Sequence, residues 1–101
     1  MNNYRIVIDP GHGGEDPGAS GNGIIEKNLT LEISKYMYDR FKELGIPVYI
    51  TRTTDETISP TERVKRILNA YGNNKNVIVV SNHINAGGAD GQSVTNIKYN
   101  N

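Results

Sequence analysis

The chain has 101 residues and no cysteine, and its eleven basic residues balance eleven acidic ones, so the formal net charge is zero. A neutral chain has no long-range field to recruit polyanions, and we therefore expect no nucleic-acid partner. The lack of cysteine excludes disulfides and thiolate metal sites, leaving His, Asp and Glu as possible ligands. This length predicts one domain, residues 1–101.

The N-terminal part predicts a strand that delivers a long loop. Ile6-Val7-Ile8 is a short β-branched run typical of a buried strand, and Asp9-Pro10-Gly11 follows it directly. From Asp9 to Gly23 glycines recur too often for a helix or strand to persist, and a loop of this length usually has a function. The residues before the strand lack the basic and apolar regions of a signal peptide, so we expect none, and no stretch is long enough to span a membrane.

A helix is predicted next, from about Leu29 to Leu44. Asn28 is a suitable N-cap, and Gly45 supplies the C-terminal stop. Apolar residues recur between them at steps of three and four. The predicted apolar face consists of Leu29, Ile33, Tyr36, Met37, Phe41 and Leu44.

The second half repeats the alternation of strand and helix. Residues 47–51 predict a strand, and Ser59-Pro60-Thr61-Glu62 has the N-cap, first-turn proline and capping-box glutamate of a helix start. That helix ends near Gly72, and Val77–Val80 predicts a strand covered on both faces. Residues 94–99 indicate a weak further strand. We expect an α/β fold, a mostly parallel sheet with flanking helices. The second helix's apolar face comprises Val64, Ile67, Leu68 and Tyr71.

Three possible metal ligands follow from this arrangement. His12 comes after the first strand and His83 after the third, so both lie at the carboxyl edge if these strands are parallel neighbours. Glu26 precedes the first helix, at the mouth of the same loop. Two imidazoles and one carboxylate form a catalytic-type zinc shell, which leaves a position for water and suits amide hydrolysis. Taken singly, each residue also has an interpretation without metal. His12 or His83 would be a surface or turn histidine, and Glu26 would be a solvated charge near a helix N-terminus.

Other polar residues have open roles. Asn82 or Asn85 could orient ligands or donate to an oxyanion, and Asn85 is the candidate for substrate binding. Arg52 and Arg63 could bind a substrate carboxylate, but a surface charge or a pair with a nearby acid is an equal alternative. The glycine-rich loop lacks the motifs of a nucleotide site.

The sequence resembles the zinc-dependent N-acetylmuramoyl-L-alanine amidases in three ordered motifs. These are IVIDPGHGG at 6–14, EKNLTL at 26–31 and SNHINA at 81–86. Thr51-Arg52, Glu62-Arg63 and Asn69-Ala70 extend the resemblance, which runs from about Tyr4 to Gly91. It implies that His12, Glu26 and His83 bind Zn²⁺. It also implies cleavage of the amide between N-acetylmuramic acid and L-alanine in bacterial peptidoglycan.

The resemblance also implies what this chain lacks. The family's general base is a glutamate beyond the end of this chain, so the catalytic base is left unassigned, although Glu15 or Asp16 could line the site. We therefore expect a partial amidase catalytic domain, truncated relative to the family. The alternative is a non-hydrolytic fragment that binds zinc or cell wall. Uncovered apolar surfaces predict self-association. Action on the cell wall without a signal peptide predicts cytoplasmic synthesis with release by lysis or a holin, or a cropped chain.

Overall fold

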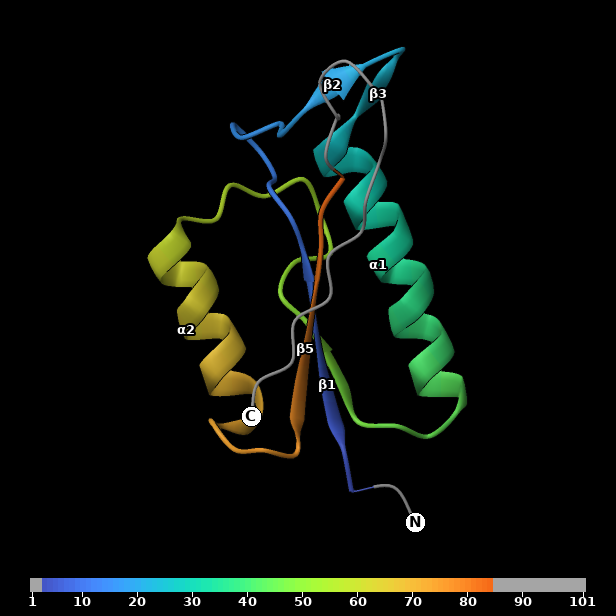
Figure 1. Ribbon diagram of the computed structural model, residues 1–101, viewed down its shortest axis with the longest axis vertical. Helices are drawn as coiled ribbons and strands as arrows, with labels where there is room; N and C mark the ends of the chain where they lie inside the picture. Colours follow the sequence, from blue (N-terminus) through green and yellow to red (C-terminus); the bar gives the residue numbers. More distant parts are fainter. Residues whose placement is uncertain (1–2, 85–101) are drawn as a thin grey trace.

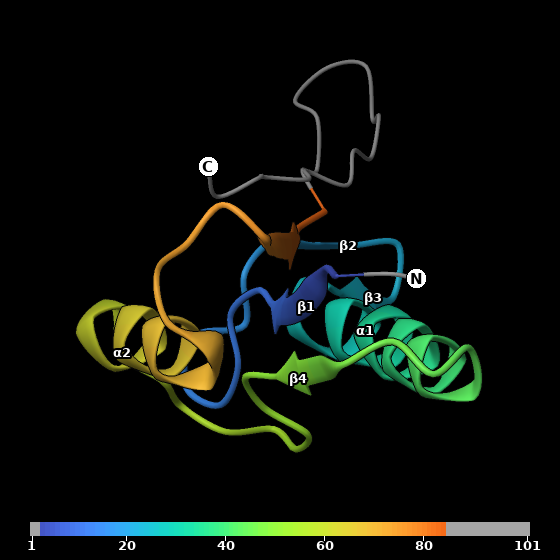
Figure 2. The same cartoon turned by 90° about the horizontal axis from the view of Figure 1, so that it is seen from below.

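In the computed structural model, which describes residues 3–84, a parallel three-stranded sheet carries one helix on each face (Figures 1 and 2). The strand order is β4-β1-β5, and a two-stranded hairpin, β2-β3, lies at the carboxyl end of the sheet. This confirms the predicted α/β class with a mostly parallel sheet and flanking helices. The elements are β1 (Arg5–Pro10), β2 (Ser20–Gly21), β3 (Ile24–Ile25), α1 (Glu26–Glu43), β4 (Val48–Ile50), α2 (Pro60–Tyr71) and β5 (Val77–Asn82).

The central strand β1 aligns the ends of its neighbours. It pairs in parallel with β4, and with β5 as far as Pro10 opposite Asn82. The prediction that the first and third strands are neighbours is therefore correct for β1 and β5. His12 and His83 both lie just after the carboxyl ends of these strands. The main core cluster comprises Ile6, Ile8, Ile50 and Val80, with Met37, Tyr38, Phe41, Ile46, Val48 and Ile78 packed against it.

The strand β5 is less covered than predicted. Ile78 and Val79 are only half-buried, although Val77 and Val80 are buried. Within residues 3–84, β5 pairs with β1 alone, so one of its edges has no strand beside it in this part of the chain. The predicted strand at 94–99 lies outside the described residues.

Helix α1 begins three residues before the predicted start, and Asn28 is not its N-cap. The N-cap is Ile25, whose side chain makes no capping hydrogen bond. The amide groups of Glu26 and Lys27 donate instead to the carbonyls of Ala19 and Pro17, at 2.8 and 3.0 Å. Because the preceding loop satisfies these first-turn donors, a side-chain cap is not needed.

The inward face of α1 is polar at its start and apolar further on. Glu26, Thr30 and Ser34 are its buried residues, one helical turn apart. Further along, Tyr38 packs on the core, whereas Tyr36, which we predicted on the apolar face, is 73% exposed. Each residue of an α-helix turns by about 100°, so Tyr38 lies about 200° around the helix axis from Tyr36. The two side chains therefore point to nearly opposite sides of the helix.

The loop predicted from Asp9 to Gly23 is wrong at its end, because residues 20–25 form a hairpin of β2 and β3. Asn22 and Gly23 occupy its turn with φ angles of 52° and 78°. Positive φ at both turn residues is the pattern that Asn-Gly favours in two-residue hairpins. That dipeptide was therefore the sequence signal for this hairpin.

Helix α2 begins as predicted. Ser59 is the N-cap, and its hydroxyl accepts a hydrogen bond from the Glu62 amide at 3.1 Å. Its apolar face is only partly covered, since Val64 is 55% and Leu68 41% exposed. Neither helix is long and apolar enough to cross a membrane, within the residues described.

Candidate metal centre

Three side chains bring their ligand atoms together at the carboxyl edge of the sheet. Nε2 of His12 lies 3.0 Å from Oε2 of Glu26 and 3.3 Å from Nδ1 of His83. The third separation, from Nδ1 of His83 to Oε2 of Glu26, is 3.4 Å. The predicted residues therefore form one cluster, which could hold a metal ion. They come from the loop after β1, the start of α1 and the residue after β5.

The state of the His12 ring is set by a carboxylate on its other side. Oδ2 of Asp16 lies 2.8 Å from Nδ1 of His12. A carboxylate can only accept, so this contact favours a proton on Nδ1; the neutral ring of that tautomer directs its Nε2 lone pair at Glu26 and His83. The same hydrogen bond lowers the pKa of Asp16. Lone pairs that converge in this way repel one another unless a proton or a cation lies between them.

The Glu26 carboxylate is buried but held in its charged form. Burial opposes its ionisation, yet hydrogen bonds from the amides of Ala19 and Ile84, both at 2.9 Å, and the nearby imidazoles outweigh this, so the pKa of Glu26 is lowered. Each oxygen accepts one of these amides. The carboxylate is therefore oriented by the backbone on both sides of the site.

Two glycines allow the ligands to approach so closely. A methyl group on Gly11 would lie 2.6 Å from the His83 ring. At Gly18, where φ is +70°, it would lie 2.6 Å from Oε1 of Glu26 and 2.7 Å from Cδ2 of His12. All three separations are shorter than van der Waals contact, so both positions favour glycine.

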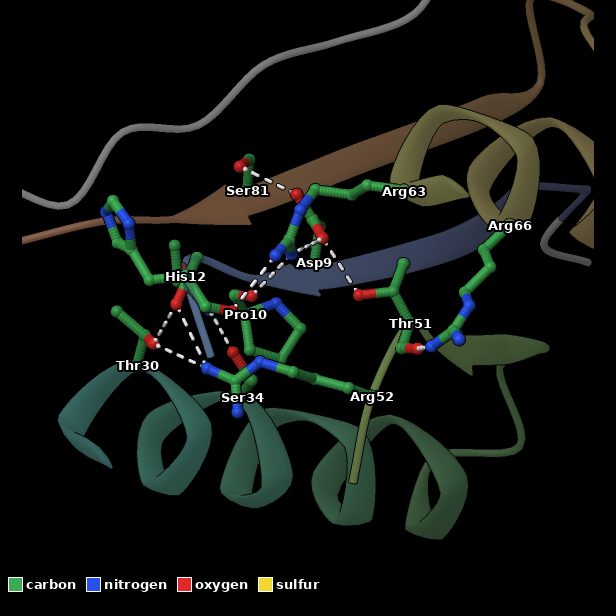
Figure 3. A network of polar contacts seen from close by, with 12 residues as sticks. Asp9, Pro10, His12, Thr30, Ser34, Thr51, Arg52, Arg63, Arg66 and Ser81 are labelled. Carbon is green, nitrogen blue, oxygen red and sulfur yellow. Dashed lines mark hydrogen bonds and ion pairs between the residues drawn. The ribbon is translucent and has the colours of Figure 1, made fainter. Parts of the chain in front are cut away.

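The two arginines left open by the sequence bind the protein itself. Arg63 pairs with Asp9 at 2.7 Å, and Arg52 is 2% exposed with its Nη2 on the carbonyls of Gly11 and Lys27, both at 3.0 Å (Figure 3). Of the alternatives, pairing with a nearby acid is correct for Arg63. Neither alternative is correct for Arg52. It is buried, and among residues 3–84 its hydrogen bonds go to carbonyl and hydroxyl oxygens and not to a carboxylate.

Of the remaining candidates, Asn82 and Asp16 bind other residues of the protein, Glu15 is exposed, and Asn85 is not described. Asn82 is buried, and its Nδ2 donates to Ser34 at 2.9 Å, so it ties β5 to α1. Asp16 is the partner of His12, and Glu15 is exposed beside it. Asn85, our candidate for substrate binding, lies outside the described residues.

The family model for N-acetylmuramoyl-L-alanine amidase matches residues 6–100. The chain belongs to this family. Among curated amidases, a sporulation-specific N-acetylmuramoyl-L-alanine amidase of Bacillus subtilis strain 168 is 40% identical over 91 residues. That match covers 86% of this chain and 33% of the relative, so the chain spans about a third of the length of that relative.

Solved amidase structures have the same fold. The N-acetylmuramoyl-L-alanine amidase from Clostridium difficile 630 has a TM-score of 0.75 at 34% identity, covering 88% of this chain and 47% of that one. The catalytic domain of CwlV, an amidase from Bacillus (Paenibacillus) polymyxa var. colistinus, has a TM-score of 0.73 at 31% identity. There the match covers 85% of this chain and 48% of the other. The chain thus aligns with just under half of each of these solved chains.

Proposed function

We propose that this chain is a partial catalytic domain of a zinc-dependent amidase, and that His12, Glu26 and His83 bind the zinc ion. The substrate would be bacterial peptidoglycan, and the bond cleaved would be the amide between N-acetylmuramic acid and the L-alanine of the stem peptide. Membership of the amidase family supports the reaction class. The convergence of three ligand atoms is the observation that carries the proposal.

The spacing of these atoms suits zinc. Zinc–ligand bonds of about 2.0–2.1 Å in tetrahedral geometry place neighbouring ligand atoms roughly 3.3–3.4 Å apart. The three separations in the cluster are 3.0, 3.3 and 3.4 Å. The set of two imidazoles and one carboxylate is also that of catalytic rather than structural zinc sites.

The protein's own residues would prepare the site for hydrolysis. Asp16 would hold the His12 tautomer, while the amides of Ala19 and Ile84 would keep Glu26 ionised. The chemistry that zinc supplies in such a site is polarisation of the scissile carbonyl and activation of water. No general base is assigned, because the family's glutamate is expected beyond the end of this chain, and Glu26 and Asp16 are engaged at the cluster.

A second candidate function is zinc or cell-wall binding without hydrolysis. It is favoured by the engagement of Asp16, whose Oδ2 faces His12 and whose Oδ1 accepts the Gly18 amide at 3.1 Å. A carboxylate occupied in this way is a poor proton acceptor for water. The two functions differ in turnover and not in metal binding.

The decisive experiment is release of stem peptides from purified peptidoglycan, followed by mass spectrometry with zinc and then with a chelator. Product with a free L-alanine amine that disappears on chelation, and in the Glu26→Gln variant, supports the amidase. Bound zinc and retained peptidoglycan binding without product supports the binding fragment. Absence of zinc binding by the wild-type chain would contradict the zinc amidase and the zinc-binding fragment, and would leave only a fragment that binds cell wall without metal.

A further inference from the structure

Two arginines bind three successive backbone carbonyls in the segment that carries the first ligand (Figure 3). Nη1 of Arg63 donates to the Pro10 carbonyl at 2.8 Å, and its Nη2 donates to the His12 carbonyl at 3.0 Å. Between them, the Gly11 carbonyl accepts from Nη2 of Arg52 at 3.0 Å. Both arginines are therefore bound to the backbone on which His12 is placed.

This backbone needs support, because His12 has a φ of 64°. The left-handed region is unfavourable for residues other than glycine, and it persists where the surrounding structure enforces it. The direction of the His12 side chain depends on this angle. Without the arginines, relaxation of φ would turn Nε2 away from Glu26 and His83.

The same arginines reach the segments that carry the other two ligands. Arg52 also donates to the carbonyl of Lys27, the residue after Glu26. Arg63 binds Oδ1 of Asp9 at 2.7 Å, and the Ser81 hydroxyl donates to Oδ2 of the same carboxylate at 3.2 Å. Ser81 lies two residues before His83 in the chain. The network thus joins the loop after β1 to the start of α1 and the end of β5.

The chemistry of the contacts explains why both residues are arginines. A guanidinium offers five N–H donors in a rigid planar fork, whereas a lysine ammonium is a single point charge on a flexible stem. Through this fork, Nη1 and Nη2 of Arg63 bind Pro10, His12 and Asp9 from one side chain. Burial of the Arg52 charge lowers its pKa, and the hydrogen bonds of Nη1 and Nη2 offset this cost, although its buried Nε has no partner among the described residues.

We propose that Arg52 and Arg63 are positioning residues, which hold the His12 segment in the conformation that directs its ring at Glu26 and His83. The inference rests on the proposed function, because it assigns the purpose of this arrangement to metal binding. This role requires no contact between either arginine and the substrate.

The test compares Arg63→Lys with Arg66→Lys in the full chain. Arg66 is a matched control, because it lies on the same helix and also binds carboxylates and a carbonyl, namely Glu56, Glu62 and the Thr51 carbonyl. Within the part of the chain that the structure describes, its hydrogen bonds go to these three residues and not to residues 10–12. We expect R63K to weaken zinc affinity roughly 10- to 100-fold, measured by competition with a chelator, and R66K to leave it unchanged. The absorption spectrum of the Co²⁺-loaded protein should change in R63K alone.

A second readout needs no metal. The amides of Gly11 and Gly13 bind the carbonyls of Asn82 and Asp16 at 2.9 and 2.8 Å. Their hydrogen exchange in the metal-free chain should accelerate in R63K relative to R66K. Equal exchange and equal affinity in the two variants would overturn the proposal. Faster exchange in R63K, with no zinc bound even by the wild type, would refute the zinc site and leave the positioning of this segment supported.

Discussion

The Asp16 carboxylate lies 2.8 Å from Nδ1 of His12, on the side of the ring opposite Glu26. A histidine that binds metal commonly donates its other N–H to a carboxylate, which fixes the ring and its tautomer. Asp16 itself is largely exposed. Its contribution should therefore concern the site more than the fold.

We expect Asp16→Asn to weaken zinc binding by roughly 10- to 100-fold, because a neutral amide orients the His12 ring less strongly. Its unfolding free energy should change by no more than about 0.5 kcal/mol, as for most surface substitutions. Calorimetric titration and urea denaturation of the metal-free chain would measure the two effects. Asp39→Asn on the exposed side of α1 is the control, and an equal loss of affinity there would contradict this role.

A methyl group at Gly18 should damage the site, whereas one at Gly23 should not. Both glycines have positive φ, +70° and +78°, so alanine strains both backbones by about 1–2 kcal/mol. Only at Gly18 would the new atom meet Glu26 and His12; at Gly23 nothing lies within 4 Å. Gly18→Ala should lose zinc affinity in a chelator competition while Gly23→Ala retains it. Equal affinities would show that the ligands can move aside.

The Ser59 cap should contribute measurably to stability. Removing its hydroxyl leaves the Glu62 amide without its partner, and Ser59→Ala should lower the unfolding free energy by about 0.5–2 kcal/mol in chemical denaturation. Thr61→Ala, two residues later on the exposed surface, is the matched control. A loss no greater than that of the control would mean that water replaces the cap.

Acidification should weaken the link between Glu56 and α2. Hydrogen bonds from Arg66 lower the pKa of Glu56 below its ordinary value of 4.5. Because the pKa of Glu56 is lower in the folded than in the unfolded chain, this ion pair stabilises the fold fully above about pH 4.5. The stabilisation is lost as the pH falls through the folded-state pKa of Glu56. Urea midpoints between pH 7 and pH 3 should fall more in the wild type than in Glu56→Gln. Parallel curves for the two proteins would refute this contribution.

The exposed apolar face of α2 should promote self-association of this chain. Val64 and Leu68 lie one turn apart and remain 55% and 41% exposed. We expect sedimentation equilibrium to detect concentration-dependent association, which the double substitution Val64→Lys and Leu68→Lys weakens. A wild-type chain that stays monomeric throughout would contradict the expectation.

The sequence alone predicted the strands and the helix start that depend on local residue patterns. The β-branched runs Ile6–Ile8 and Val77–Val80 predicted strands, and the Ser59-Pro60 start predicted the second helix to the residue. The cluster of His12, Glu26 and His83 could be predicted because the two histidines follow the ends of β1 and β5 and Glu26 lies at the start of α1. Once β1 and β5 are parallel neighbours, their carboxyl ends must share one edge.

Tertiary contacts alone decided the rest. The first turn of α1 forms because loop carbonyls at Pro17 and Ala19 accept its amides, so Asn28 is not required as a cap. Likewise, Arg52 and Arg63 bind carbonyls 41 and 51–53 residues away in the chain. No local pattern encodes such partners, because the free energy of burying an arginine depends on which acceptors the folded chain brings to it.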